Sequence, residues 1–199
     1  KYKNIYQGVF PVKCNQQKNI LEKIIEFGSP WNFGLEVGSK SELLIGLALL
    51  ENKNSLLICN GYKDKKYIEI ATLARKLGKN PIIVIEQRDE VKRIIQAVQD
   101  LKATPLIGIR AKLSSKSSGR WSKSIGDNSK FGLSIPEIMS TIKELKEANL
   151  INEMKLLHFH IGSQISDIAV IKDALQEASQ IYVELCKIGA PNLNSSTYI

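Results

Sequence analysis

The sequence lacks a long apolar run, because none of its uninterrupted hydrophobic stretches approaches the roughly 18 residues that a transmembrane helix needs. No apolar core of a signal peptide follows the polar residues 1–4 either. These two absences predict a cytoplasmic protein without a membrane partner. With 43% hydrophobic and 24% charged residues among 199, the composition is that of an ordinary soluble domain with one sizeable core.

Cysteine is also scarce. Cys14, Cys59 and Cys186 are an odd number at wide spacing, and no two of them form a Cys-x-x-Cys pair. This pattern argues against a disulfide framework and against a zinc site of the cysteine-rich kind. The sequence itself therefore predicts no metal-ligating residues.

The net charge of +8 does not come from uninterrupted basic runs. Lysines alternate with acids, as in residues 63–66 (Lys-Asp-Lys-Lys) and 143–146 (Lys-Glu-Leu-Lys). Such mixing is typical of solvated helix faces rather than of a phosphate-binding surface. We therefore expect no nucleic-acid partner.

Apolar runs of strand length alternate with longer segments of helical periodicity, which predicts an α/β fold with a parallel sheet. The expected strands are residues 8–13, 33–37, 55–60, 81–86, 105–112 and 154–161. The expected helices are residues 16–27, from 39 to about 50, from about 64 to 78, 90–101, 135–148 and 169–188. Gly28 is read as the stop of the first helix, and Ser39 with Glu42 has the spacing of a capping box.

A polar residue ends each of these apolar runs: Lys13, Glu36, Asn60, Glu86, Arg110 and His160. The first five recur every 23 to 26 residues, which is the length of one strand, one helix and two short loops. Strands of a (β/α)8 barrel deliver such residues to one common mouth, whereas strands of a doubly wound sheet need not. We therefore expect an incomplete TIM-type barrel of about six β/α units.

The interval between the fifth and sixth strand ends is 50 residues and contains an irregular stretch, residues 114–130. A long loop at a barrel mouth is typical of an active-site element, with a flexible insertion as the alternative. Residues 191–199 are polar and are expected to form an irregular tail after a barrel domain at residues 1–190. Since six units cannot close an eight-stranded barrel, the chain is expected to be the amino-terminal part of a larger protein or a truncated copy.

Lys13 has two interpretations. It is either the first solvated residue after a buried strand, or a lysine that forms a Schiff base at the carboxyl end of a barrel strand. Position in the sequence does not decide between them.

Five motifs in order resemble the biosynthetic arginine decarboxylases, which are pyridoxal-phosphate enzymes of fold type III with a barrel like those of alanine racemase and ornithine decarboxylase. They are residues 9–17 (VFPVKCNQQ), 34–43 (GLEVGSKSEL), 58–64 (ICNGYKD), 129–134 (SKFGLS) and 157–165 (LHFHIGSQI). The resemblance extends from about residue 5 to residue 192.

The resemblance implies a role for five residues. Lys13 matches the lysine that bonds covalently to pyridoxal phosphate, and burial in the pocket would favour the neutral amine that attacks an aldehyde. His160 matches the histidine that stacks on the cofactor ring, and Ser163 the serine near the phosphate. Arg110 corresponds to an arginine near the ring hydroxyl, and Glu36 to an acid at the end of the second strand. For Arg110 and Glu36 a structural ion pair is the alternative.

The implied activity is decarboxylation of L-arginine to agmatine and carbon dioxide in polyamine biosynthesis, including that of spermidine. The resemblance further implies a magnesium ion, a β-domain that completes the site, and a homo-oligomer for the full-length protein. Because the groups expected to bind the substrate lie beyond these residues, we expect the 199 residues alone to be inactive. Two alternatives stay open: a related decarboxylase or racemase of the same fold that acts on ornithine, lysine, diaminopimelate or alanine, or a non-catalytic pyridoxal-phosphate-binding barrel.

Overall fold

The computed structural model describes residues 6–113, 132–162, 165, 167–190, 192–193 and, for the backbone, 195–198. The chain forms two compact units. The first unit is Lys1–Ile83 with Gln96–Leu106, and the second is Val84–Ile95 with Ile107–Ile199. The predicted loop at residues 114–130 lies outside the described residues.

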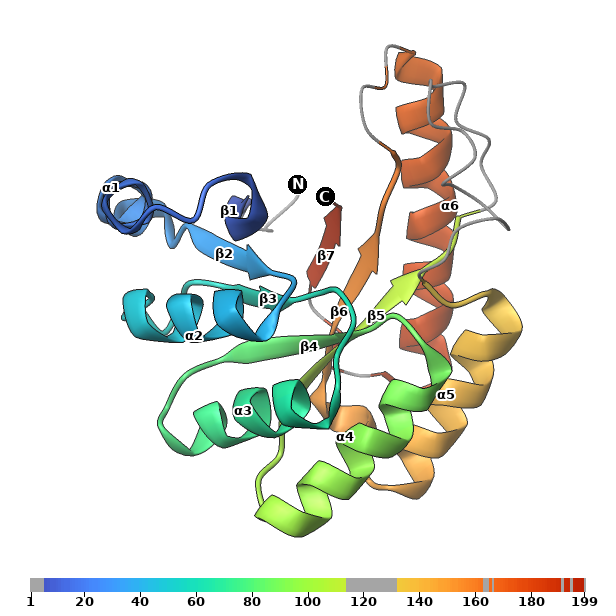
Figure 1. Cartoon of the computed structure of the whole chain (residues 1–199). Helices are drawn as coiled ribbons and strands as arrows, with labels where there is room; N and C mark the ends of the chain where they lie inside the picture. Colours follow the sequence, from blue (N-terminus) through green and yellow to red (C-terminus); the bar gives the residue numbers. More distant parts are fainter. Residues whose placement is uncertain are drawn as a thin grey trace. The chain divides into compact units, whose positions relative to one another are not determined.

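The first unit contains parallel strands in sequence order: β1 (Val9–Pro11), β2 (Gly34–Val37), β3 (Leu57–Cys59) and the beginning of β4 (Pro81–Ile85). Its helices are α1 (Lys18–Gly28), α2 (Lys40–Leu49), α3 (Lys65–Lys76) and the end of α4 (Arg88–Leu101). Helix α2 packs against β2 and α3 packs against α2 (Figure 1). In the register, Pro11 pairs with Glu36 and Glu36 pairs with Ile58, so the carboxyl ends of the strands are level.

The second unit contains the end of β4, the beginning of α4, and strands β5 (Leu106–Ala111), β6 (Met154–Phe159) and β7 (Ser195–Tyr198). Helices α5 (Ile135–Glu147) and α6 (Ile168–Lys187) connect these strands. β5 pairs with β6 and β6 with β7, both in parallel, and β7 lies beside β6 in Figure 1. Alternating strands and helices with parallel pairing confirm the α/β class and the partial TIM-type barrel.

Strand β7 shows that the prediction of an irregular tail is wrong for residues 195–198. Its four residues, Ser-Ser-Thr-Tyr, have too little apolar character to be recognised as a strand from hydrophobicity. Pairing with the edge of β6 supplies the main-chain partners, and residues such as Thr and Tyr fit a pleated surface well. The boundary of a barrel domain at residue 190 stays a prediction.

Gly28 is the last residue of α1, as predicted, and its φ of −82° is right-handed. A short 3₁₀ turn, Ser29–Trp31, follows, and Asn32 takes the left-handed conformation with φ of 52°. A Cβ atom on Gly28 would lie only 2.4 Å from Cβ of Phe33. Close packing against Phe33 therefore explains this glycine.

The predicted capping box of α2 is half confirmed. Ser39 Oγ accepts a hydrogen bond from the Glu42 N–H at 3.3 Å, whereas the Glu42 carboxylate accepts from Gly38 N–H at 2.7 Å instead of Ser39 N–H. At the start of α5, Glu137 Oε2 accepts from both the N–H and the hydroxyl of Ser134, each at 2.7 Å. This contact lowers the pKa of the Glu137 carboxyl group, because backbone and side-chain hydrogen bonds favour its charged form.

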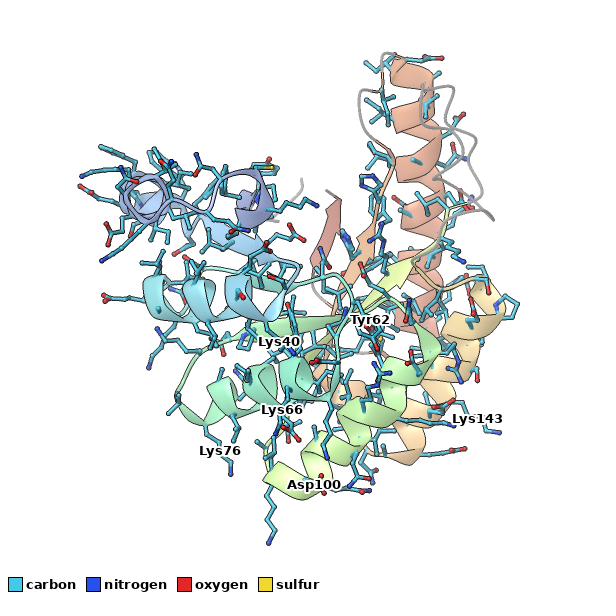
Figure 2. The ribbon with its side chains drawn as sticks, in the orientation of Figure 1. Lys40, Tyr62, Lys66, Lys76, Asp100 and Lys143 are labelled. Atoms are coloured by element: carbon cyan, nitrogen blue, oxygen red, sulfur yellow. The ribbon has the colours of Figure 1, made fainter. Side chains whose placement is uncertain are left out.

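The lysines of the helices are exposed, and Lys76 and Lys143 extend outward in Figure 2. Lys66 forms an ion pair with Glu69 at 2.7 Å on the surface of α3. In the second unit, Arg88 at the start of α4 pairs with Glu144 of α5 and donates to Thr141 Oγ1 at 2.8 Å. This pair is partly exposed and holds the two helices together.

Two titratable side chains are buried where β2 and β3 lie against α3. The Tyr67 hydroxyl of α3 donates to the carbonyl of Val37 at 3.1 Å, and burial raises its pKa. Cys59, at the end of β3, has no exposed surface, and burial raises the pKa of its thiol to about 12. Because the usual value is about 8.5, this thiol stays protonated well into the alkaline range.

We expect Cys59 to resist thiol reagents in the folded chain, whereas the exposed Cys14 and Cys186 react. Titration with a chromogenic disulfide reagent at mildly alkaline pH should label two thiols quickly, and the third only in concentrated guanidinium chloride. The raised pKa also means that Cys59 favours folding fully below about pH 8.5 and loses this contribution as pH rises toward 12.

The alanine variant Cys59→Ala provides the control. It should leave two reactive thiols in both states and reduce the fall in unfolding free energy between about pH 9 and 12. Equal labelling rates for all three thiols of the native chain would contradict the burial of Cys59.

Candidate active site

Lys13 lies in a 3₁₀ turn, Val12–Cys14, directly after β1. The turn is closed by a hydrogen bond from Asn15 N–H to the Val12 carbonyl at 3.1 Å. Asn15 Oδ1 in turn accepts from Gln17 N–H at 2.9 Å, which is an Asx turn that leads into α1. β1 thus ends at Pro11, two residues before the lysine that was predicted to close it.

The Lys13 side chain is 62% exposed. Its Nζ lies 4.0 Å from Oε2 of Glu36, whose side chain is only 3% exposed. The register of β1 and β2 places Glu36 close to Lys13, because Pro11 and Glu36 are directly paired. The structure therefore brings together Lys13 and Glu36, two of the five predicted site residues.

Asn60 fixes the orientation of Glu36. Its Nδ2 donates to Glu36 Oε1 at 3.1 Å, and its side chain is buried at the end of β3. Asn60 Oδ1 is buried without a hydrogen-bond partner among the described residues. The sequence had identified Asn60 as a strand-end residue but gave it no role in the site.

A tight contact between two loops supports this group. Gly61 has φ of +75°, and a Cβ atom there would lie 2.4 Å from the carbonyl oxygen of Gly38. The Gly61 carbonyl accepts from Nζ of the fully buried Lys63 at 2.5 Å. The loops after β2 and β3 are therefore held together beside Glu36 and Asn60.

In the second unit, Arg110 and Glu86 form an ion pair with 2.6 Å between Nη1 and Oε1. Glu86 follows β4 directly, and Arg110 is the penultimate residue of β5. The Glu86 side chain is 1% exposed and that of Arg110 is 18% exposed. Arg110 thus forms an ion pair in this structure, and its partner is a residue that the sequence had not placed in the site.

His160 follows β6 directly and is half-buried. It belongs to the same unit as Arg110, and Ser163 lies outside the described residues. The roles of Lys13, Glu36, Arg110, His160 and Ser163 toward a cofactor stay predictions.

The groups at these strand ends fit pyridoxal phosphate by their chemistry. A primary amine on an exposed side chain is what an aldehyde needs in order to form a covalent bond, and Lys13 supplies it beside a buried carboxylate. A guanidinium group suits an anionic oxygen, and Arg110 supplies it. The buried Asn60 Oδ1, with no hydrogen-bond partner among the described residues, is a further polar atom at a strand end.

No helix within the described ranges is both long enough and apolar enough to cross a membrane. Within the same ranges, His, Cys, Asp and Glu side chains form no group of three or more that could hold a metal ion.

The chain is similar to curated proteins named biosynthetic arginine decarboxylase. It is 96% identical to that of Prochlorococcus marinus strain AS9601 over 191 residues, and 64% identical to that of Parasynechococcus marenigrum strain WH8102 over 190 residues. Each match covers 96% of this chain and 30% of the relative. The chain therefore spans less than a third of the length of these relatives.

Among solved structures, the biosynthetic arginine decarboxylase SpeA of Campylobacter jejuni matches 98% of this chain and 31% of its own, with 37% identity and a TM-score of 0.87. A diaminopimelate decarboxylase of Helicobacter pylori, in complex with L-lysine, matches 99% of this chain and 48% of its own with a TM-score of 0.77. At 23% identity, the second likeness concerns the fold alone.

One family model covers almost the whole chain. It describes the pyridoxal binding domain of pyridoxal-dependent decarboxylases and matches residues 2–194. This range contains both groups of strand-end residues, Lys13 with Glu36 and Arg110 with Glu86. The chain therefore belongs to the family of pyridoxal-dependent decarboxylases.

Proposed function

We propose that the protein to which this chain belongs is an arginine decarboxylase, which converts L-arginine to agmatine and carbon dioxide in polyamine biosynthesis. The observation that carries the proposal is the 96% identity over 191 residues to a relative of that name. In this reaction the carboxylate leaves Cα as carbon dioxide and one proton takes its place. Pyridoxal phosphate, when bound, supplies a ring that accepts the electron pair left at Cα.

The first unit contributes the covalent anchor. Lys13 would hold the cofactor through its primary amine, which is a group that can bond covalently to an aldehyde. The buried Glu36 carboxylate, with its Oε2 4.0 Å from Lys13 Nζ, would keep this side chain beside the end of β1. Asn60 keeps Glu36 in place through its 3.1 Å hydrogen bond.

We assign three residues of the second unit to cofactor binding: Arg110, His160 and Ser163. Arg110 binds an anionic oxygen of the cofactor, His160 stacks on its ring, and Ser163 lies near its phosphate. The ion pair with Glu86 and the position of His160 directly after β6 support the first two assignments. The third rests on the resemblance of the motif at residues 157–165.

The experiment uses a hybrid enzyme: the full-length relative from P. marinus strain AS9601 with the residues of this chain in place of its own 191 matched residues. Carbon dioxide release is measured with L-arginine, L-ornithine, L-lysine and diaminopimelate. We expect turnover of arginine to exceed that of the other substrates by about 10²-fold or more, since a site that pairs with a guanidinium rejects amines that lack it.

The 199-residue chain with added cofactor is the second arm of this experiment. We expect it to show no tight cofactor binding and no steady carbon dioxide release. A preference of the hybrid enzyme for ornithine or diaminopimelate would favour the related decarboxylases, and bound cofactor without turnover of any substrate would favour a non-catalytic barrel.

The proposal includes a cytoplasmic location and a homo-oligomer of the full-length protein. It also includes a magnesium ion, which rests on the resemblance alone.

A further inference from the structure

Glu86 is a buried carboxylate that has no role in the function proposed above. Its Oε1 lies 2.6 Å from Nη1 of Arg110, and only 1% of its side chain is exposed. We propose that Glu86 is a positioning residue, which holds the Arg110 guanidinium at the carboxyl end of β5 so that it binds an anionic oxygen of pyridoxal phosphate. This inference rests on the proposed function, because it takes the cofactor from it.

The backbone around the pair is fixed by four hydrogen bonds. Glu86 N–H donates to Oε2 of the fully buried Glu90 at 2.8 Å, and the Glu86 carbonyl accepts from Gly132 N–H at 3.0 Å. The Arg110 carbonyl accepts from Leu133 N–H at 2.7 Å, and the Leu133 carbonyl accepts from Lys112 N–H at 2.9 Å. Both partners of the ion pair therefore stand on a rigid frame within one unit.

The Arg110 guanidinium group has further N–H donors besides the one that bonds to Glu86. A guanidinium group carries five N–H donors, and within the described residues Glu86 is the one side chain that it bonds. Because Glu86 and the backbone hold the arginine in one conformation, binding an anion costs little additional rotamer entropy. The remaining donors match the fork geometry that arginine uses for oxyanions.

Stabilisation of the fold does not by itself explain the ion pair between Glu86 and Arg110. The cost of desolvating two charges offsets most of their attraction when an ion pair is buried. The same unit contains a second arginine–glutamate pair, Arg88 with Glu144, which joins two helices and is 31% and 26% exposed. The Glu86–Arg110 pair instead stands at the carboxyl ends of strands, where barrel enzymes place their chemistry.

Glu86 also compensates the charge of Arg110. Without this carboxylate, the positive potential at the strand end would increase and would disfavour a proton on a nearby cationic group. The proposal therefore predicts an effect on the titration of the bound cofactor as well as on its affinity. If the ion pair were purely structural, its loss would change neither the affinity for the cofactor nor the titration of the bound cofactor.

The test compares three variants of the hybrid enzyme described above, each loaded with pyridoxal phosphate. We expect Glu86→Gln to raise the dissociation constant of the cofactor about tenfold and to lower the pH midpoint of its visible absorbance by about one unit. Glu86→Asp retains the negative charge, so its pH midpoint should lie close to that of the unsubstituted hybrid enzyme. Melting temperatures and circular dichroism of all variants establish that they are folded.

Glu144→Gln is the matched control, because it also breaks an arginine–glutamate pair of the second unit. We expect it to lower the melting temperature, with a change of less than about twofold in the dissociation constant. If Glu86→Gln lowers only the melting temperature and leaves affinity and pH midpoint at their original values, the inference is wrong. If the unsubstituted hybrid enzyme shows no visible absorbance with pyridoxal phosphate, the proposed function fails first, and the inference fails with it.

Discussion

Replacement of Lys13 by alanine is expected to abolish covalent binding of pyridoxal phosphate in the hybrid enzyme and to lower its turnover of arginine by about 10³-fold or more. The physical reason is that the proposed function assigns to the Lys13 amine the covalent attachment of the cofactor; its Nζ lies 4.0 Å from Oε2 of the buried Glu36 carboxylate. The measurements are the visible absorbance of the bound cofactor and the rate of carbon dioxide release.

The Lys13→Arg variant distinguishes the loss of the primary amine from the loss of the positive charge. Arginine keeps a cation beside Glu36, yet a guanidinium group does not form the bond to the aldehyde, so this variant should be as inactive as alanine. Lys18→Ala, five residues further on, removes an exposed lysine paired with Glu22 at 3.6 Å and should leave both measurements unchanged. Visible absorbance and turnover retained in Lys13→Ala would refute the assignment.

Gly61→Ala is expected to lower the free energy of unfolding of the chain by about 3 kcal/mol or more. Two costs add at this position. The residue has φ of +75°, and the new Cβ atom would lie 2.4 Å from the Gly38 carbonyl oxygen, which is backbone and cannot rotate away. Relief of the overlap separates the loops after β2 and β3, which also displaces Asn60 from Glu36. Urea unfolding followed by circular dichroism measures the change.

Gly78→Ala is the matched control, since Gly78 has the same φ of +75°. The nearest atoms to a Cβ there are Nζ and Cε of Lys53, at 3.7 and 3.8 Å, at the flexible end of a side chain. This variant has the conformational cost alone, about 1 kcal/mol. Equal destabilisation by the two substitutions would show that the contact between Gly61 and Gly38 does not hold the loops together.

Much of the fold could be predicted because apolar periodicity is a local property of the sequence. All six predicted strands overlap observed strands, and the helices differ from expectation by a few residues at their ends. Strand β7 could not be predicted in this way, since its residues gain their partners from β6 rather than from their own hydrophobicity. Gly28 ends the first helix as predicted, but its close packing against Phe33 could not be predicted, because that contact arises only in the folded chain.

The sequence predicted which residues lie at the ends of strands, and the candidate site consists of such residues. Lys13, Glu36 and Arg110 stand at or just beyond the carboxyl ends of strands, as the repeat of 23 to 26 residues suggested, and His160 does so after a longer interval of 50 residues. Glu86 and Asn60 had the same spacing, yet nothing in the sequence indicates which strand-end residues bond to one another. That choice depends on register, which pairs Glu36 with Ile58 in β3 and so brings Asn60 close to Glu36.

The sequence by itself determined the α/β class, the repeat of about 24 residues, and the position of a lysine at the end of the first strand. These features follow from the order of apolar and polar residues along the chain. Only the tertiary structure decided that the Lys13 side chain is exposed, that Asn60 orients Glu36, and that Glu86 holds Arg110. Hydrogen bonds and ion pairs between strands depend on where side chains meet in space, and residues 24 positions apart in sequence meet only after the strands have paired.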